Sequence, residues 1–187
     1  MAATTVNICN IALRSLGVKR ISTLSDNVES ARVMTDLYEY IRDEMLSIHP
    51  WNFTIVYSDT LAENATDPNF DFDYSYALPV GCLRVIELED ASDKFKRVGN
   101  NLFTDTEDPK IKYITQITDT SQFSKSFVTA FAARLAAEAA YALTNSKTLQ
   151  EKKFEEYGAK LSQAKSTDGQ EGTLDKQEDS SWINDRD

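Results

Sequence analysis

The chain has 187 residues, a formal net charge of −10 and a pI near 4.6. This acidity argues against a general nucleic-acid binder and against a binder of anionic membranes, because both need clustered Lys and Arg. No apolar run approaches the roughly 18 residues of a membrane-spanning helix, and the amino-terminal residues lack the basic and apolar regions of a signal peptide.

The start of the chain predicts an amphipathic helix. Thr4 or Thr5 can cap its amino end, and Gly17 is expected to end it with an apolar contact from Val18. The apolar side chains recur at helical spacing: Ile8, Cys9, Ala12, Leu13 and Leu16. The connector over residues 18 to 25 is expected to pack its apolar side chains back onto the core.

A second helix is predicted from a capping box and a long apolar stripe. Asp26 and Glu29 have the spacing of the box, and Pro50 ends the helix by restricting the backbone of His49. The stripe has steps of three and four residues: Ala31, Met34, Tyr38, Ile41, Met45 and Ile48. It predicts the core face of a helix bundle, and a coiled coil between chains is the alternative.

The middle of the chain has the alternation and turn residues of β-structure. One strand is expected over residues 53 to 61, and residues 62 to 77 read as a polar loop. Shorter strands are expected at 83–88, 95–98, 102–103 and 112–117. The pattern predicts a small antiparallel sheet inserted between two helical halves, with a hairpin turn at Gly99.

Two further helices follow. The third is expected over residues 125 to 144, with Ser121 or Ser124 near its start, and eight of the thirteen residues from Ala130 to Ala142 are alanine. Alanine favours helix and allows neighbouring backbones to approach closely. The fourth is expected over residues 149 to 166, with a charged, solvated face.

The last twenty residues, from Asp168, form an acidic arm. They hold seven acids and two bases, a net charge of −5, and have few apolar side chains before Trp182 and Ile183. Such a segment cannot bury enough surface to offset its ordering entropy. The terminal tryptophan suggests that the arm docks onto a partner, and a merely loose chain end is the alternative.

Together these elements predict an α+β fold that is mainly α. A bundle of four helices is expected from residues 1–52 and 121–168, a β-rich insertion from 53–120, and an extended arm from 169–187. Cys9 and Cys82 have neither disulfide nor metal spacing and are expected to be reduced and buried.

The sequence gives no catalytic, metal or cofactor site. His49, the single histidine, has no nucleophile or carboxylate suggested beside it, and a histidine in a last helical turn usually complements the helix dipole or a free carbonyl. Three acids stand close together at Asp67, Asp71 and Asp73, but the glycine and glutamate of a calcium loop are missing. No cofactor is therefore expected.

The segment around these acids alternates with aromatic side chains, namely Phe70, Phe72, Tyr74 and Tyr76. Alternation of this kind fits either a strand or the tip of a recognition loop. Both interpretations stay open, and in the second these residues are a candidate contact loop.

Several short motifs occur in a fixed order. They are Asn10–Gly17 with Ile21, Tyr38–Leu46, His49–Phe53, Tyr76–Pro79, Cys82–Val85 and Ser181–Arg186. In this order and spacing the chain resembles the tail tubular protein A family, the head-to-tail adaptors of short-tailed bacteriophages. Leu16, Gly17, Trp51 and Phe53 belong to the matching signature. Gly81 and Asp185 depart from it, where an acidic residue and alanine are usual.

The resemblance implies a structural virion protein of the tail or neck, assembled in the host cytoplasm. It implies a homo-oligomeric ring of about twelve subunits between the portal protein and the tail nozzle protein. The helices would face the portal and the β-rich part the nozzle. The candidate tail-side contact residues would then be Phe70, Phe72, Tyr74 and Tyr76. Double-stranded DNA would pass through the ring without specific binding, and no membrane is involved. Trp182, Ile183 and Arg186 of the arm are the candidate portal-binding residues.

Two other classes of function stay open. The chain fits a monomeric helical interaction module, such as a chaperone or regulator, whose acidic tail binds a partner. An enzyme is ranked last, for instance a wall-degrading hydrolase using Glu63 and Asp71, because no acid–base pair has a fixed spacing. We therefore expect a protein without catalytic activity.

Overall fold

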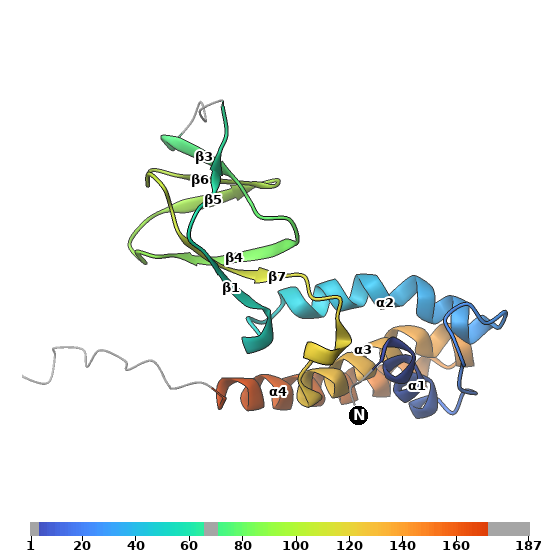
Figure 1. The fold of residues 1–187 in the computed structure, drawn as a ribbon. Helices are drawn as coiled ribbons and strands as arrows, with labels where there is room; N and C mark the ends of the chain where they lie inside the picture. Colours follow the sequence, from blue (N-terminus) through green and yellow to red (C-terminus); the bar gives the residue numbers. More distant parts are fainter. Residues whose placement is uncertain (1–3, 66–70, 172–187) are drawn as a thin grey trace, which may run out of the picture.

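The computed structural model describes residues 4–65 and 71–171. These residues form four α-helices and two antiparallel sheets, which confirms an α+β fold. The helices gather in one part, here called the helical module, and the strands form a β module that stands on one end of it (Figure 1). The two parts give the molecule an L shape.

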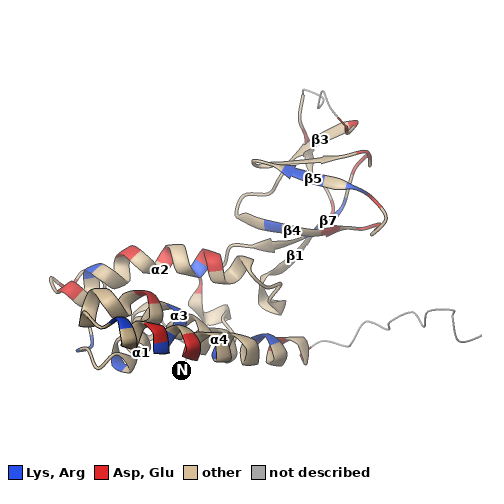
Figure 2. Ribbon diagram, turned by 180° about the vertical axis from the view of Figure 1, so that it is seen from behind, with Lys and Arg blue, Asp and Glu red and all other residues tan. Residues whose placement is uncertain are grey.

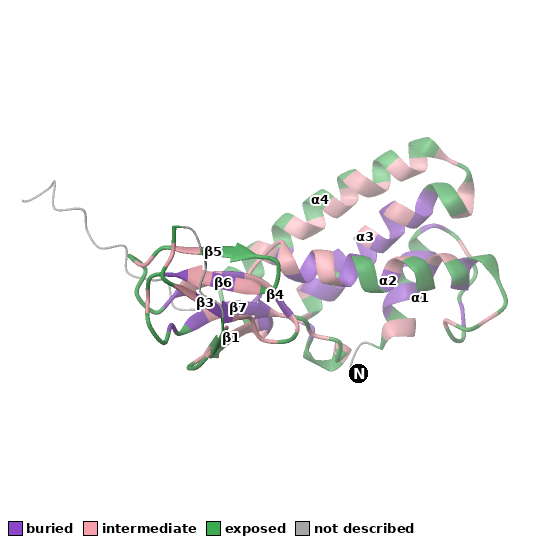
Figure 3. Ribbon diagram, turned by 90° about the horizontal axis from the view of Figure 1, so that it is seen from above, coloured by how far each residue is buried: buried purple, intermediate pink, exposed green. Residues whose placement is uncertain are grey.

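The helical module is built around α3. Its elements are α1 (Thr5–Ser15), α2 (Glu29–Ser47), α3 (Lys125–Thr144) and α4 (Lys147–Gly169). α3 packs against each of the other three helices, and Figure 3 shows much of its middle buried. α3 has the predicted bounds, with Ser124 accepting a hydrogen bond from the backbone N–H of Phe127. α4 begins two residues earlier and ends three residues later than predicted, with Ser146 as its cap.

α1 starts and stops as predicted. The Thr4 hydroxyl accepts a hydrogen bond from the Asn7 N–H, 3.2 Å away. At the other end Gly17 has a φ of 75°, and the Val18 N–H reaches back to the Leu13 carbonyl. This reversal satisfies carbonyls that the helix leaves free, and it needs the left-handed backbone that glycine tolerates.

The predicted cap of α2 is wrong, although its buried stripe is confirmed. The helix begins at Glu29 after Val28, which offers no side-chain cap. Asp26 instead closes the connector turn by accepting hydrogen bonds from Ser22 and Thr23. The stripe along α2 is buried in the core of its own chain, with Met34, Ile41 and Met45 fully buried. It is therefore a core face of the monomer and not a seam between chains.

The β module contains two sheets instead of the single one predicted. One has the order β1–β7–β4, formed by Ile55–Ser58, Ile111–Thr115 and Cys82–Leu88. The other has the order β2–β3–β6–β5, formed by Ala62–Glu63, Tyr74–Ala77, Asn101–Thr104 and Phe95–Val98. β1 and β2 are consecutive, so residues 55–63 contribute to both sheets.

Both sheets cover one small core. Tyr76 and Leu102 from the second sheet and Val85 and Ile111 from the first are buried together. At the seam between β5 and β4 the Arg97 guanidinium donates to the carbonyls of Leu83 and Cys82, 2.6 and 3.3 Å away. This side chain replaces ladder hydrogen bonds between the two sheets.

Two expectations for the β region need correction, and a third is confirmed. The strand predicted over 53–61 starts with a 3-10 turn, Asn52–Thr54, and is extended only from Ile55 to Ser58. The region 62–77, predicted as a loop, contains β2 and β3. The hairpin at Gly99 is confirmed: Val98 faces Asn101, and Gly99 has a φ of 60°.

Cys9 and Cys82 are free and buried, as expected. Burial raises the pKa of the Cys9 thiol to about 12, so this side chain behaves as a small apolar residue. In the described part of the chain, no helix has the length and apolarity to cross a membrane.

Candidate functional site: the junction of the two modules

The two modules meet where α2 ends and the first strand begins. Phe53 lies in the 3-10 turn between α2 and β1, Leu83 comes from the start of β4, and Ile117 comes from the link between β7 and α3. All three are half-buried and pack against the core of the helical module. The β module is therefore attached through apolar contacts from three chain segments that lie far apart in the sequence.

A polar cluster fastens the end of α4 to this junction. Asp168, in the last turn of α4, has a side chain only 3% exposed. Its carboxylate accepts the Asn52 backbone N–H at 3.2 and 3.3 Å and lies 3.2 Å from His49 Nε2. The Asn52 side-chain amide donates to the Asp168 carbonyl oxygen at 2.7 Å. We call His49, Asn52 and Asp168 the Asp168 clasp.

The position of Asp168 corrects the prediction that the acidic arm begins there. A carboxylate in the last helical turn is unfavourable beside the helix dipole, and burial adds a desolvation penalty. Hydrogen bonds from Asn52 and His49 offset both. An acidic residue at the unfavourable end of a helix is the one signal in the sequence for the clasp. Its partners Asn52 and His49 lie 116 and 119 residues away in the chain.

His49 therefore pairs with a carboxylate and not with a helix carbonyl, contrary to the sequence prediction. Burial lowers the pKa of His49 below 6.5, and Asp168 opposes only part of that shift. The positive charges of Lys165 and Arg84 lower the pKa further. The ring is thus neutral at physiological pH, and a neutral ring protonated on Nε2 donates to Asp168.

Trp51 anchors the same corner from inside. It is fully buried, and its indole N–H donates to the Met45 carbonyl at 2.8 Å. Its ring meets those of His49 and Phe127 edge-on, with centroids 4.7 and 5.1 Å apart. The signature residues Trp51 and Phe53 thus lie at the module junction, whereas Leu16 and Gly17 form the end of α1.

The aromatic candidates near residue 70 do not form one exposed loop. Tyr74 and Tyr76 belong to β3, and Tyr76 is 1% exposed. The Tyr76 hydroxyl accepts the Asp108 N–H at 3.0 Å, and burial raises its pKa. Tyr76 is therefore a core residue and not a contact residue. Phe72 is half-buried, and Phe70 lies outside the described residues.

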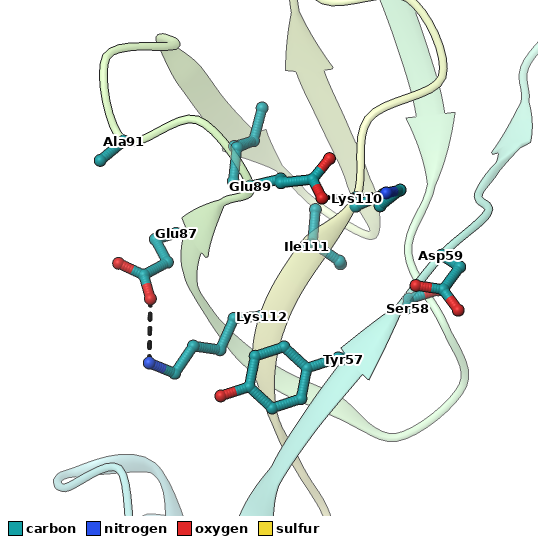
Figure 4. A pocket seen from close by; sticks show the side chains of 10 residues that line it. Tyr57, Ser58, Asp59, Glu87, Glu89, Ala91, Lys110, Ile111 and Lys112 are labelled. Atoms are coloured by element: carbon teal, nitrogen blue, oxygen red, sulfur yellow. Dashed lines mark hydrogen bonds and ion pairs between the residues drawn. The ribbon is translucent and has the colours of Figure 1, made fainter. Parts of the chain in front are cut away.

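A hollow of about 370 Å³ lies on the outer face of the first sheet (Figure 4). Lys112 pairs with Glu87 at 2.9 Å and lies over the Tyr57 ring. Lys110 pairs with Glu89 at the same distance. The two lysines of this hollow are thus paired with neighbouring glutamates, which is typical of a solvated sheet face. Among the described residues, no group of three or more His, Cys, Asp or Glu could hold a metal ion.

The candidate arm residues Trp182, Ile183 and Arg186 lie outside the described residues, which end at Glu171. The structure does fix the point from which the arm starts, directly after the Asp168 clasp.

Comparison with known proteins gives no relative: no protein-family model matches the chain, and no curated protein matches it either.

Proposed function

We propose that this chain is a structural adaptor of a bacteriophage tail, without catalytic activity. Copies form a ring of about twelve subunits between the portal protein and the tail nozzle protein, and the genome leaves through the ring. In this proposal the four helices act as a bundle that faces the portal, the β module faces the nozzle, and the carboxyl-terminal arm binds the portal. The proposal rests on the order of the sequence motifs.

The observation that best supports it is the Asp168 clasp. Asp168 holds the last turn of α4 against the module junction through four hydrogen-bonding contacts, three to its buried carboxylate and one to its backbone carbonyl. The end of α4, after which the arm follows in the sequence, is therefore held in place. The sixteen residues from 172 to 187 span roughly 50 Å when extended. An anchored arm of this length suits attachment to a neighbouring protein, because its root need not be ordered again on binding.

The charge of the chain supports the same function. A net charge of −10 disfavours tight contacts with phosphates, and a channel for DNA must let the duplex slide. In the proposed ring, DNA passes without specific binding.

The test is deletion of residues 172–187, which spares α4 and the clasp. We expect the truncated protein to lose co-sedimentation with portal rings, and Trp182→Ala to weaken it by about 2 kcal/mol, because buried tryptophans dominate interfaces. Trp182→Phe is the matched control and should bind nearly as well. Unchanged co-sedimentation of the truncated protein would refute portal binding by the arm. Images of the mixture would separate a ring from a monomeric interaction module.

A further inference from the structure

A first exposed patch lies in the inner corner of the L. Tyr40 on α2 is 72% exposed and is flanked by the exposed acids Asp36 and Glu39; Val80, in the loop between β3 and β4, is fully exposed. We call these four residues the corner patch.

Two hydrogen bonds bring the two parts of the corner patch together. Asp43, one turn after Tyr40 on α2, accepts from the Gln116 side chain at 2.7 Å. The Gln116 N–H donates to the carbonyl of Gly81, the residue after Val80, at 2.8 Å. The patch therefore spans both modules with a fixed shape, and its surface is apolar and acidic.

A second exposed patch lies on α1 and the connector that follows it. Ile11 is 39% exposed, and Arg14 is one turn further along the same helix. Lys19 and Arg20 follow the Gly17 turn and are exposed. Within the described residues none of the three cations forms an ion pair. The ribbon in Figure 2 marks Lys and Arg positions in blue. We call these four residues the α1 patch.

Hydrogen bonds also fix the arrangement of the α1 patch. The Asn10 side chain donates to the Ile21 carbonyl and accepts the Ile21 N–H, both at 2.9 Å, which ties the connector to α1. The two patches thus offer apolar surface with opposite charge. In Figure 1 the β module rises on one side of α2 and α1 lies on the other, so the patches are on different sides of the molecule.

We infer that the corner patch of one copy binds the α1 patch of the next copy. Each patch carries one sign of charge, so neither can bind its own copy in another molecule, whereas each complements the other. Because the two patches lie on different sides, a single pair cannot use both at once. Such head-to-tail contacts propagate into a ring or a helical filament. The inference deepens the proposed function, because it names the contact between ring subunits.

The experiment uses two variants of the full chain, each with one patch removed. Tyr40→Asp with Val80→Asp makes the corner patch polar and more acidic. Arg14→Glu with Lys19→Glu makes the α1 patch acidic. All four positions are exposed, so both variants should keep the wild-type circular dichroism and melting temperature. Sedimentation velocity at low ionic strength measures association over increasing concentration.

We expect the wild type to associate beyond a dimer and each variant alone to associate at least about tenfold more weakly. An equimolar mixture of the two variants should form 1:1 pairs and nothing larger, because only one intact corner patch and one intact α1 patch can meet. Tyr57→Asp and Lys125→Glu are matched controls at exposed positions outside both patches, and they should associate like wild type.

Three results would overturn the contact. They are a wild type that stays monomeric at millimolar concentration, a wild type that stops at a dimer, and a mixture that forms no pair. Portal binding is scored separately by co-sedimentation. A wild type that self-associates but does not co-sediment with portal rings would refute the adaptor function alone. A wild type that co-sediments with portal rings but does not self-associate would refute only this contact.

Discussion

At the scale of single residues, Asp168 would be costly to leave without its partners, because its side chain is only 3% exposed. It is a buried carboxylate at a helix carboxyl end, and its stability depends on the Asn52 N–H and His49. The Asn52 N–H and the His49 ring in turn depend on Asp168 as their acceptor. The clasp thus joins the turn after α2, the first 3-10 turn and α4 into one unit.

Replacing this carboxylate should destabilise the whole protein. We expect Asp168→Ala to lower the free energy of unfolding by about 2 kcal/mol, because the Asn52 N–H and the His49 ring both lose their hydrogen-bond acceptor. Asp168→Asn keeps one acceptor oxygen and should cost less. Urea denaturation measures both. Glu155→Ala, at an exposed position of the same helix, is the control and should change stability by less than about 0.5 kcal/mol.

His49 predicts how stability depends on pH. Its pKa is lower in the folded protein than in the unfolded chain, chiefly because of burial, so the unfolded chain binds the proton more readily. Stability is therefore fully present above the unfolded pKa near 6.5 and declines as the pH falls through that value. His49→Gln should abolish this decline between about pH 7.5 and 5.5, since the chain has one histidine. An unchanged pH profile in that variant would contradict the assignment.

At the scale of elements, α3 holds the helical module together because most of its buried side chains are small. Five of its alanines, Ala130, Ala136, Ala137, Ala139 and Ala140, are fully buried, so neighbouring helices approach its backbone. Its phenylalanines Phe127 and Phe131 fill the wider space near the junction. α3 therefore has small side chains where helices are close and large ones where the modules meet.

This packing leaves no room for larger side chains. We expect Ala136→Leu to destabilise the protein by about 1 to 3 kcal/mol, because an overpacked core forces side chains and helices to shift. Ala142→Leu lies on the exposed face of the same helix and should be nearly neutral. Urea denaturation of the two variants compares them directly. Equal effects would show that α3 is not tightly packed at Ala136.

The helices could be predicted because their signals are local. The Ser124 cap and the apolar spacing of α3 lie within one segment, and the predicted bounds of that helix are correct. The β module could be predicted only in outline, because strand bounds depend on partners elsewhere: Tyr76 is buried by pairing with Leu102 in β6. The Asp168 clasp was missed for the same reason, since no periodicity connects Asp168 with Asn52.

At the scale of the whole molecule, the two modules have separate cores of unequal size. Within the described residues, the core of the helical module contains 24 buried side chains and that of the β module contains 7. The modules share the junction contacts, and within the β module the Arg97 side chain supplies the hydrogen bonds across the seam between β4 and β5 in the described residues. The β module, which has the smaller core, should therefore unfold locally before the helical module does.

Native-state hydrogen exchange measures this difference. We expect the amides of β3 and β6 to share an opening free energy that is lower than that of the α3 amides by at least about 2 kcal/mol, the contribution of roughly one large buried side chain. Arg97→Ala should lower the value for the β module further and leave α3 unchanged, because only the seam loses hydrogen bonds. Lys96→Ala, its exposed neighbour on β5, is the matched control. If β6 and α3 instead converge on one opening free energy, the two modules unfold as a single unit and the junction is stronger than the seam and core sizes indicate.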